Sequence, residues 1–566
     1  WAGSIPPTIT SLTLGKEFNQ AIRPRTLPTT LQMLTFGDMF NQSIKKCTLP
    51  NSLITLTMGR SFNTKFQIGS LPSSLKSLIL GDSYNASLMA NVLPDSLTSL
   101  VFGGKFNQKI EAGMIPASLL TLTFGTYFDH PLGIRSLPLS LTQLTFGHSF
   151  NHHISFKLVF NHQDVDEDED EAEDRPKASL ATLKFGHCFS KDVDLSMLGS
   201  LTDVTFGDLF ERVIMPNTLP SSLQSITFGK RYIHPLKQGT LPCGLRSLTL
   251  DSYFNQPLNE YSLPSSITSL KFGSEFNHPL FPGVLPTSLT HLDVGWSFDH
   301  VIGHGVLPSS LLELVFGEYF NKMVMPGTLP NGLKSLTFSN DFEEPLLEGS
   351  LPSSITYLVF IEYDQPFTKG TLPQSLTYLD LGNKYSKYIA PGTLPNSLKR
   401  LKHINWKLQL MDGTLPQGLE ELRINVWSED HVCPNSLKRL HLKNYLNYGS
   451  IPKSVEYLHI YRETWIETAL KETIPLLPLS INTLSLKFQA PMNDERECIQ
   501  DATNLFKKLV SVNQHITTYH IRLWWTYKSE GEPLYVKLTF RSIPEKYLAL
   551  LLNPSFHPTS FNIISL

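Results

Sequence analysis

Histidine is the residue type in this chain that most suggests chemistry, because an imidazole can bind a metal ion or exchange a proton near neutral pH. Eighteen histidines occur in the 566 residues. Four of them fall at or next to one position of a recurring pattern, and a pair lies beside an acidic run: His130, His234, His278 and His300, then His152 and His153. Repetition explains the four more simply than metal ligation does. We therefore predict no metal site.

The cysteines indicate a reducing environment rather than a disulfide framework. They are five in number and widely scattered, and none forms a Cys-x-x-Cys pair: Cys47, Cys188, Cys243, Cys433 and Cys498. An odd, scattered set favours an intracellular, cytoplasmic location. We expect Cys47, Cys188 and Cys243 to be buried and to act as small apolar side chains.

Motifs that would indicate catalysis or cofactor binding do not occur in the sequence. There is no Gly-x-Gly-x-x-Gly, no phosphate-binding Gly-Lys-Thr loop, no Gly-x-Ser-x-Gly and no His-Glu-x-x-His. We therefore predict a protein that is not an enzyme, with no catalytic residues and no cofactor.

Charge and hydropathy bear on the partners that such a protein can have. The formal net charge is −3, so no overall positive field would attract nucleic acid or an anionic membrane. No run of eighteen apolar residues occurs. The chain starts at Trp1 with neither an initiator methionine nor a signal peptide, and we expect a trimmed N-terminus. The expected partner is a protein, with neither nucleic acid nor membrane involved, and the oligomeric state stays open.

A repeat of 22 residues organises most of the chain. Leu-Pro or Ile-Pro pairs begin at 5, 27, 49, 71, 93, 115 and 137, and again at 219, 241, 263, 285, 307, 329 and 351. In the coil that begins at Leu27, apolar residues follow the proline by three, six and eight positions, as Leu31, Leu34 and Phe36. Then come Gly37, an aromatic residue and an asparagine.

This pattern predicts a β-rich, leucine-rich-repeat-like solenoid. The run Leu-x-x-Leu-x-Phe suits a short strand that buries its apolar side against the next coil, about 4.8 Å away in a parallel ladder. We expect a right-handed, curved stack of ~22-residue coils with a parallel sheet on its concave side. The proline fixes φ at the strand entry, the following serine satisfies backbone groups, and the glycine supplies a φ that other residues avoid.

Two further positions of the coil predict interior rows. The aromatic residue would stack into a spine along the axis, and its members include Phe18, Phe40, Phe62, Tyr84, Phe106, Phe128, Phe150, Phe254, Phe276, Phe298 and Phe320. The next residue is usually asparagine, which can donate and accept at once. We expect a buried asparagine ladder there that satisfies turn amides and carbonyls.

The template resembles the FNIP repeat, a relative of leucine-rich repeats found in social amoebae and giant viruses of amoebae. The Leu-Pro pair, the aromatic-Asn core and strings such as LPDSLTSLVF at 93–102 carry the resemblance, which covers residues 5 to about 490. The unit is also similar to the short bacterial leucine-rich repeat. FNIP proteins often carry an F-box, so the resemblance implies a substrate receptor of a cullin-type ubiquitin ligase if an F-box precedes residue 1.

An acidic insertion interrupts the repeat at about 158–176. Gly147 and Gly186 stand 39 residues apart, 17 more than one repeat, and Asp164 to Asp174 is almost wholly Asp and Glu. A block of like charges repels itself and cannot bury a core, so we predict a disordered loop. The functional alternative is that the acidic run attracts a basic partner. Calcium is disfavoured, since the run lacks the glycine and spacing of an EF-hand.

The concave strands change chemistry in the C-terminal third. Outward positions are mostly Ser and Thr in the first half. Between about 352 and 460 they become Tyr357, Tyr378, Lys399, Arg400, Lys402, Arg423, Lys438, Arg439, His441, Tyr457 and His459. Aromatic residues and arginine on such a face are typical of protein interfaces. The alternative is a solvated face in which Glu420 and Glu421 balance the neighbouring cations.

The final segment predicts a cap. The repeat domain would span 1–490, and 491–566 would form a small α+β domain that covers its open edge. Asp494 to Val512 places Ile499, Ala502, Leu505, Phe506 and Leu509 on one helical face. Tyr519 to Tyr527 and Leu534 to Ile543 alternate and are predicted to form a hairpin.

Together these features predict a non-enzymatic repeat scaffold for protein–protein interaction. A structural or self-assembling protein, cellular or viral, is the alternative.

Overall fold

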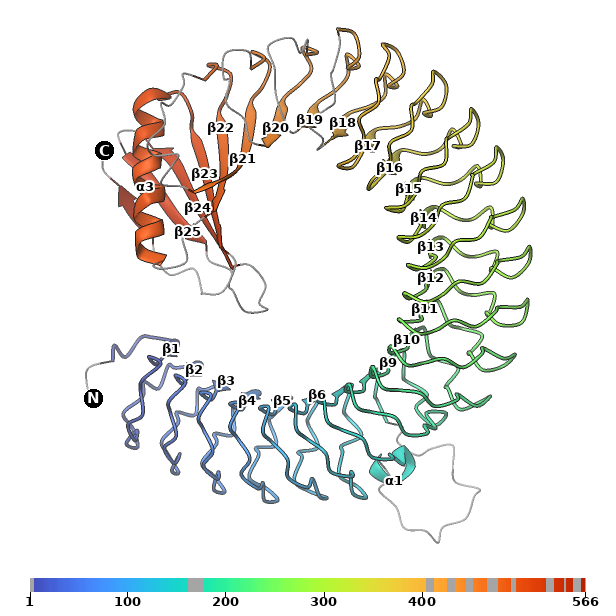
Figure 1. Ribbon diagram of the computed structural model, residues 1–566. Helices are drawn as coiled ribbons and strands as arrows, with labels where there is room; N and C mark the ends of the chain where they lie inside the picture. The colour runs from blue at the N-terminus through green and yellow to red at the C-terminus, as the bar shows by residue number, and fades with distance from the viewer. Residues whose placement is uncertain are drawn as a thin grey trace. The chain divides into compact units, whose positions relative to one another are not determined.

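The computed structural model of the protein describes residues 5–160, 178–403, 412–424, 433–443, 451–465, 477–489, 495–525, 534–543, 546–552 and 561–564. These residues divide into two compact units, Trp1–His300 and Val301–Leu566. Each unit is built from successive coils, with one strand in each coil of the repeat (Figure 1).

The first unit is a parallel sheet of three-residue strands, each paired in register with the next. The strands are β1 (Ser11–Thr13), β2 (Met33–Thr35), β3 (Thr55–Thr57), β4 (Ser77–Ile79), β5 (Ser99–Val101), β6 (Thr121–Thr123), β7 (Gln143–Thr145), β8 (Thr182–Lys184), β9 (Asp203–Thr205), β10 (Ser225–Thr227), β11 (Ser247–Thr249), β12 (Ser269–Lys271) and β13 (His291–Asp293). One strand per coil and the predicted parallel ladder are therefore confirmed.

The second unit continues the pattern and then lengthens its strands. Its parallel strands are β14 (Glu313–Val315), β15 (Ser335–Thr337), β16 (Tyr357–Val359), β17 (Tyr378–Asp380), β18 (Arg400–Lys402), β19 (Glu421–Ile424), β20 (Arg439–Lys443), β21 (Tyr457–Trp465), β22 (Thr483–Gln489) and β23 (Thr518–Trp525). Antiparallel strands follow: β24 (Leu534–Ile543), β25 (Lys546–Leu552) and β26 (Phe561–Ile564).

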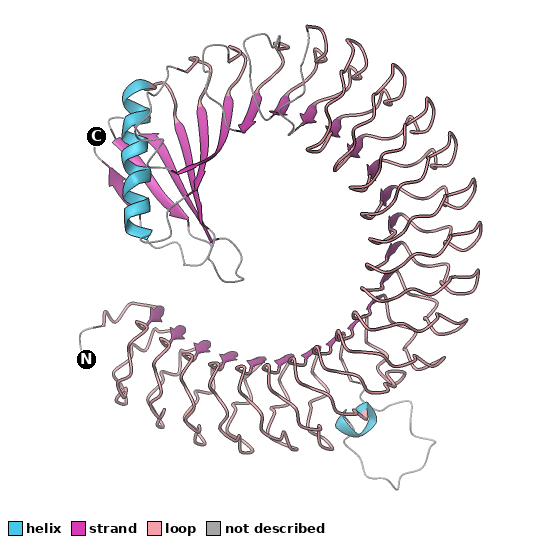
Figure 2. Cartoon of the chain, in the orientation of Figure 1, coloured by secondary structure: helices cyan, strands magenta, loops and turns pink. Residues whose placement is uncertain are grey.

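Most of the three-residue strands present their first and third residues to solvent and bury the one between them. In β3, Leu56 is fully buried while Thr55 and Thr57 are half-buried on the opposite side. In both units the strands line the inner, concave side of the coils and the turns lie on the outer side (Figure 2). The outward strand residues therefore form a continuous face in each unit.

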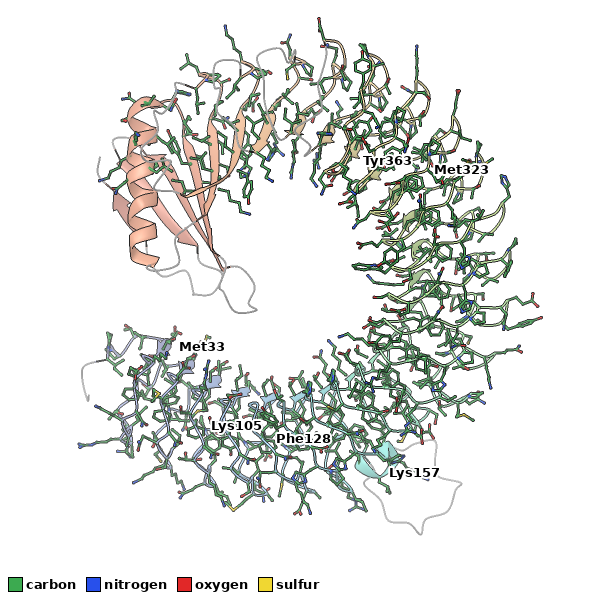
Figure 3. All side chains as sticks on the ribbon, viewed as in Figure 1. Met33, Lys105, Phe128, Lys157, Met323 and Tyr363 are labelled. Carbon is green, nitrogen blue, oxygen red and sulfur yellow. The ribbon has the colours of Figure 1, made fainter. Side chains whose placement is uncertain are left out.

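The aromatic spine explains the curvature within the first unit. From Phe40 to Phe298 its side chains are buried, and their rings stack with centroids 5.9–6.4 Å apart from one coil to the next. Paired strands lie only about 4.8 Å apart. Each coil is therefore a wedge, thicker at its aromatic row than at its strand, and a stack of wedges bends toward the strands. Figure 3 labels Phe128 of this row and Tyr363, which stacks on Phe342 in the second unit.

The glycine after each strand serves a different purpose from the predicted one. Its φ is not in the left-handed region in most coils; Gly295 and Gly382 are the exceptions among the described residues. Instead, a Cβ at Gly81 would collide with the carbonyl oxygen of Gly59 in the preceding coil. Glycine is needed because two backbones meet there, so the expectation of an unusual φ was wrong.

The left-handed conformation occurs elsewhere, two residues before the Leu-Pro pair. That position holds Gly239 and Gly349 with φ of 78° and 81°, and in other coils Arg25, Cys47 and Asn91 with φ of 62–64°. A non-glycine residue is less favourable in this conformation. The second glycine of the coil is therefore the one that φ explains.

Polar ladders connect the coils, as predicted, but one of them is not buried. The serine two residues after the proline donates to a leucine carbonyl of the preceding coil, as Ser74 does to Leu53 at 2.7 Å. The asparagine accepts from the backbone of the next coil: the amide of Asn85 donates to Oδ1 of Asn63 at 2.8 Å. Most of these asparagines are exposed, so the predicted burial was wrong.

The cysteines also differ from expectation. Cys47 and Cys243 are exposed, and Cys188 is half-buried. Cys47 occupies the turn position with a left-handed backbone, at a φ of 63°, and its side chain is exposed. The description of these three residues as buried apolar side chains was therefore wrong.

A short helix stands where the predicted insertion begins. Helix α1 (Phe156–Phe160) buries Phe156, Val159 and Phe160, and the amide of Arg135 donates to the Leu158 carbonyl at 3.0 Å. The predicted insertion, about 158–176, therefore begins inside an ordered turn of helix. The acidic run Asp164 to Asp174 lies outside the described residues.

The C-terminal segment contains the predicted helix and strand pair. Helix α3 (Glu495–Val512) buries Leu505, Phe506 and Leu509, while the side chains of Ile499 and Ala502 lie outside the described set. The helix connects β22 to β23, which pair in parallel, so the solenoid sheet gains one more strand through a helical crossover. β23 and β24 then pair antiparallel, as expected for the hairpin.

Candidate protein-binding surface on the C-terminal concave strands

The eleven residues predicted to bind a partner come together on adjacent strands of the second unit. The first strand residues of β16 to β21 align as Tyr357, Tyr378, Arg400, Glu421, Arg439 and Tyr457, which we call the first row. The third strand residues align as Val359, Asp380, Lys402, Arg423, His441 and His459, the second row. Lys399 and Lys438 precede β18 and β20 by one residue.

Two tyrosines open the first row as a stacked pair. The rings of Tyr357 and Tyr378 lie nearly parallel, with an angle of 8° and centroids 4.3 Å apart. Tyr357 is 41% exposed, whereas Tyr378, on the adjacent strand, is half-buried. Burial raises the pKa of Tyr378 to about 12, with smaller contributions from Asp380 and Tyr357. The pair presents a rigid aromatic surface to solvent, a feature common at protein interfaces.

Asp380 holds the first cation of the second row. Its carboxylate is buried, and Nζ of Lys402 lies 2.7 Å from Oδ2. The other carboxylate oxygen accepts the amide of Gly382 at 3.0 Å. Because a buried carboxylate is unfavourable without a partner, Lys402 is engaged in stabilising the fold.

The buried carboxylate of Glu421 lies close to two guanidinium groups and one imidazole ring. Oε1 lies 2.7 Å from the Arg423 guanidinium and 3.3 Å from Nε2 of His441, and Oε2 lies 3.8 Å from Nε of Arg400. The hydrogen bond from His441 and then the contact with Arg423 lower the pKa of Glu421 to about 2, against the opposing effect of burial. The carboxylate is therefore ionised at neutral pH. It balances part of the positive charge that we had predicted, from the sequence, to bind a partner.

The remaining lysines alternate with glutamates along the edge of the face. Lys399 lies 3.0 Å from Glu420, and Lys438 lies 3.5 Å from Glu456. Such exposed pairs contribute little to stability, about 0–1 kcal/mol. The alternative prediction, a solvated face in which acidic residues balance the cations, thus accounts for several of the predicted residues. Tyr357, Arg400 and Arg439 have the most exposed side chains of the first row.

A second aromatic feature escaped the sequence analysis. Tyr461 of β21 lies between Lys443 and Lys487, whose Nζ atoms are 5.9 and 5.0 Å from the centre of its ring. These three residues share one register position on β20, β21 and β22. The irregular spacing of the last coils hid the alignment, because their strands are longer than three residues. Next to this group, Nδ1 of His459 lies 2.8 Å from Oγ of Ser485.

The comparison with protein families decides what kind of chain this is. FNIP repeats match residues 2–39, 40–83, 84–127, 128–159, 232–275, 276–319, 320–362 and 363–405, together more than half of the chain. The chain belongs to the FNIP repeat family. A comparison with curated proteins found no match.

Solved structures support the same assignment of the FNIP repeat chain. It is similar to the crystal structure of CroV588, described as a novel circular leucine-rich-repeat protein, with 33% sequence identity and a TM-score of 0.70. The similarity covers 87% of this chain and 78% of that one. Among the described residues, no helix has the length and apolar character needed to cross a bilayer.

The matched repeats end at 405, just after β18 (Arg400–Lys402). The candidate surface therefore starts on FNIP repeats and continues onto coils of less regular sequence. Its two halves differ accordingly: the tyrosine pair lies on matched repeats, whereas Glu421 and the residues beyond it do not.

Proposed function

We propose that this FNIP repeat protein is a non-enzymatic scaffold that binds another protein through the concave face of β16 to β21. The observation that supports this proposal is the change of residue type at equivalent strand positions. The first strand residues of β3 to β6 are all Ser or Thr, whereas those of β16 to β21 are tyrosine, arginine and glutamate. The same backbone forms with either set, so the fold does not require the larger one.

The chemistry of the face favours a protein surface with acidic and apolar groups. Tyr357 can pack against an apolar side chain, and Arg439 and Arg400 can bind carboxylates through two parallel hydrogen bonds. Nucleic acid is a weaker candidate, because Lys402, Arg423 and His441 are already close to Asp380 and Glu421. Little positive field is left to hold a phosphate backbone, and the net charge of the chain is −3.

The family resemblance suggests a more specific role, which we include in the proposal. FNIP proteins with an F-box would act as substrate receptors of a cullin-type ubiquitin ligase, and the concave face would then hold the substrate. The scarcity and scatter of the cysteines support a reducing, cytoplasmic setting for such a complex.

The test compares variants of the full-length product in affinity purification. Tyr357→Ala combined with Arg439→Glu should remove the captured partner, because both side chains are exposed and neither contacts the buried carboxylates in the described structure. The control changes Thr57 and Thr227, the third residues of the concave strands β3 and β10 in the first unit, to Glu. Capture that survives the first variant and disappears with the second would place the binding face in the first unit.

Self-assembly is the competing outcome. Sedimentation of the purified chain over a range of concentrations would then show association, and the tyrosine and arginine changes would leave that association intact.

A further inference from the structure

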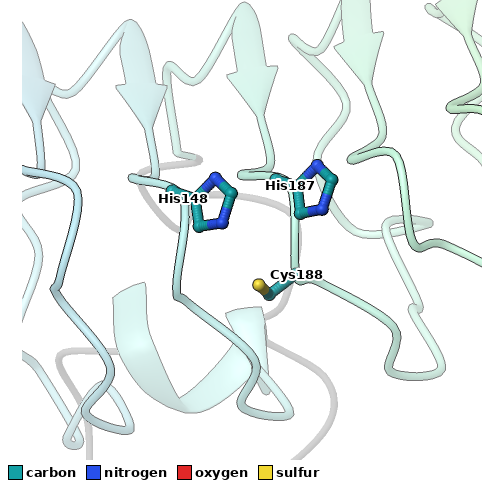
Figure 4. A group of neighbouring side chains, drawn as sticks. All are labelled: His148, His187 and Cys188. Carbon is teal, nitrogen blue, oxygen red and sulfur yellow. The ribbon is translucent and has the colours of Figure 1, made fainter.

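Three potential metal ligands meet at one point in the first unit. The ligand atoms of His148, His187 and Cys188 all lie within 4.8 Å of one another (Figure 4). His148 follows β7 by three residues, His187 follows β8 at the same offset, and Cys188 is the next residue. The two histidines therefore occupy equivalent positions of adjacent coils, although 39 residues separate them in sequence.

The backbone holds the two turns firmly together. The amide of Cys188 donates to the carbonyl of His148 at 2.8 Å, and the amide of Phe146 donates to the carbonyl of Lys184 at 2.8 Å. A Cβ at Gly186 would collide with the carbonyl oxygen of Gly147. The bases of the two histidine side chains are consequently fixed one above the other, and only side-chain rotation is left to adjust.

A carboxylate orients one of the rings. Oδ2 of Asp208, in the next coil, lies 3.0 Å from Nδ1 of His187. A hydrogen bond from Nδ1–H to that carboxylate leaves the lone pair on Nε2, which suits metal coordination. Histidines that bind metal ions usually donate their other N–H group to a carboxylate or carbonyl in this way. Lys230 lies 3.0 Å from the same carboxylate oxygen and holds Asp208 in place.

Repetition alone does not account for the group. In the other coils, the position after the glycine holds residues such as Lys16, Asp38, Arg60 and Thr126. Histidine occupies it in two consecutive described coils, and the second is followed directly by cysteine. Neither ring is deeply buried: His148 is exposed and His187 is half-buried, so an ion could reach them from solvent.

We propose that His148, His187 and Cys188 form a binding site for one transition-metal ion that accepts both nitrogen and sulfur ligands, such as Zn²⁺. Two imidazole nitrogens and a thiolate are ligands that Zn²⁺ prefers, and a fourth position stays open to water. The thiol of Cys188 releases its proton to solvent as the metal–sulfur bond forms. The ion would join the coils on either side of the acidic insertion.

Binding requires a modest rearrangement. The two rings are parallel, at an angle of 4° with centroids 4.4 Å apart, so their lone pairs do not converge on one point. A tetrahedral Zn²⁺ holds its ligand atoms about 3.4–3.7 Å apart, which follows from bond lengths of about 2.0–2.3 Å. Rotation of the exposed His148 ring about its Cβ–Cγ bond would bring its nitrogen toward Cys188.

Cobalt titration of the full chain tests the site, because Co²⁺ takes the place of Zn²⁺ and absorbs light. The reduced, chelator-treated protein should bind one equivalent and develop a thiolate-to-cobalt charge-transfer band, which Zn²⁺ then abolishes. Cys188→Ser should lose the band, and His187→Gln should bind at least about tenfold more weakly. Asp208→Asn should keep the band with weaker binding, as expected of a residue that positions His187.

Two matched controls separate this site from other ligands. Cys243→Ser and His153→Gln change exposed residues of the same types outside the group, and both should keep the band and the affinity. Deletion of Asp164 to Asp174 should also keep the band. A wild-type chain without a charge-transfer band, or a band that persists in Cys188→Ser, would overturn the proposal, as would a band that vanishes with the acidic run.

Stability offers a readout that is independent of colour. Zn²⁺ should raise the melting temperature of the wild-type chain, because it binds the folded coils in preference to the unfolded ones. The melting temperature of Cys188→Ser should stay unchanged by Zn²⁺. An equal rise in both proteins would contradict the assignment.

Discussion

The ring of Phe276 lies parallel to the ring of Phe298 in the next coil, with centroids 6.3 Å apart, and both side chains are fully buried. Within its own coil, Phe276 also stacks on Phe272 at 3.9 Å. Phe276 thus contacts aromatic rings within and between coils. Its removal should affect more than one coil.

Phe276→Ala should lower the free energy of unfolding by about 3–5 kcal/mol, as for other buried phenylalanines. Urea denaturation gives the total change, and hydrogen exchange of the amides in β12 and β13 shows where it acts. Phe281→Ala is the control, since Phe281 is 59% exposed in the same coil and should change stability little. Equal losses in the two variants would mean that the spine contributes no more than the surface does.

Asn277→Leu tests the exposed ladder. Oδ1 of Asn277 accepts the amide of Asp299 at 3.1 Å, and leucine cannot replace that acceptor. Because the side chain is exposed, water can satisfy part of the loss, and we expect a destabilisation of about 0.5–1.5 kcal/mol. Asn277→Asp keeps an acceptor and should change stability little. Hydrogen exchange of the Asp299 amide should be faster in Asn277→Leu but not in Asn277→Asp.

Gly81→Ala tests the close approach of neighbouring backbones. The added Cβ would meet the carbonyl oxygen of Gly59, so the coils must separate, and overpacking of this kind costs about 1–3 kcal/mol. Gly15 occupies the same position in the first described coil and has no atom within 4 Å of such a Cβ. Thermal melting should therefore show a clear loss for Gly81→Ala and none for Gly15→Ala.

Glu421 should make stability depend on pH. Its folded pKa of about 2 lies below the usual value of 4.5, so its ionised form is stabilised by folding. That contribution is complete above about pH 4.5 and decreases as the pH falls toward about 2. The difference in unfolding free energy between the wild type and Glu421→Gln should accordingly be larger at pH 7 than at pH 3.

Glu420→Gln is the companion measurement for this pair. Glu420 is exposed and paired with Lys399 across the surface, so its replacement should have a small effect. A Glu421→Gln variant as stable as the wild type at pH 7 would show that its cations do not stabilise it.

The sequence predicted which positions form the candidate surface. It did not predict the ion pairs that balance the charges within that surface. The outward residues of the first and second rows lie on adjacent strands, because strand alternation determines which side of the sheet a residue faces. Which cation meets which carboxylate depends on distances between neighbouring strands. Asp380 and Glu421 proved to be buried beside Lys402, Arg423 and His441, and local spacing carries no information about that depth.

The sequence by itself determined the coil length, the strand in each coil, the aromatic row and the family, because each depends on side chains at a constant step of 22 residues. The tertiary structure alone decided the features that arise between coils. Gly81 is needed because the backbone of the preceding coil lies against it, and the asparagine ladder is exposed because the turns lie at the rim. His148 and Cys188 meet because the fold places their two coils side by side. The 17 extra residues between these coils break the 22-residue period, so the period alone does not predict the contact.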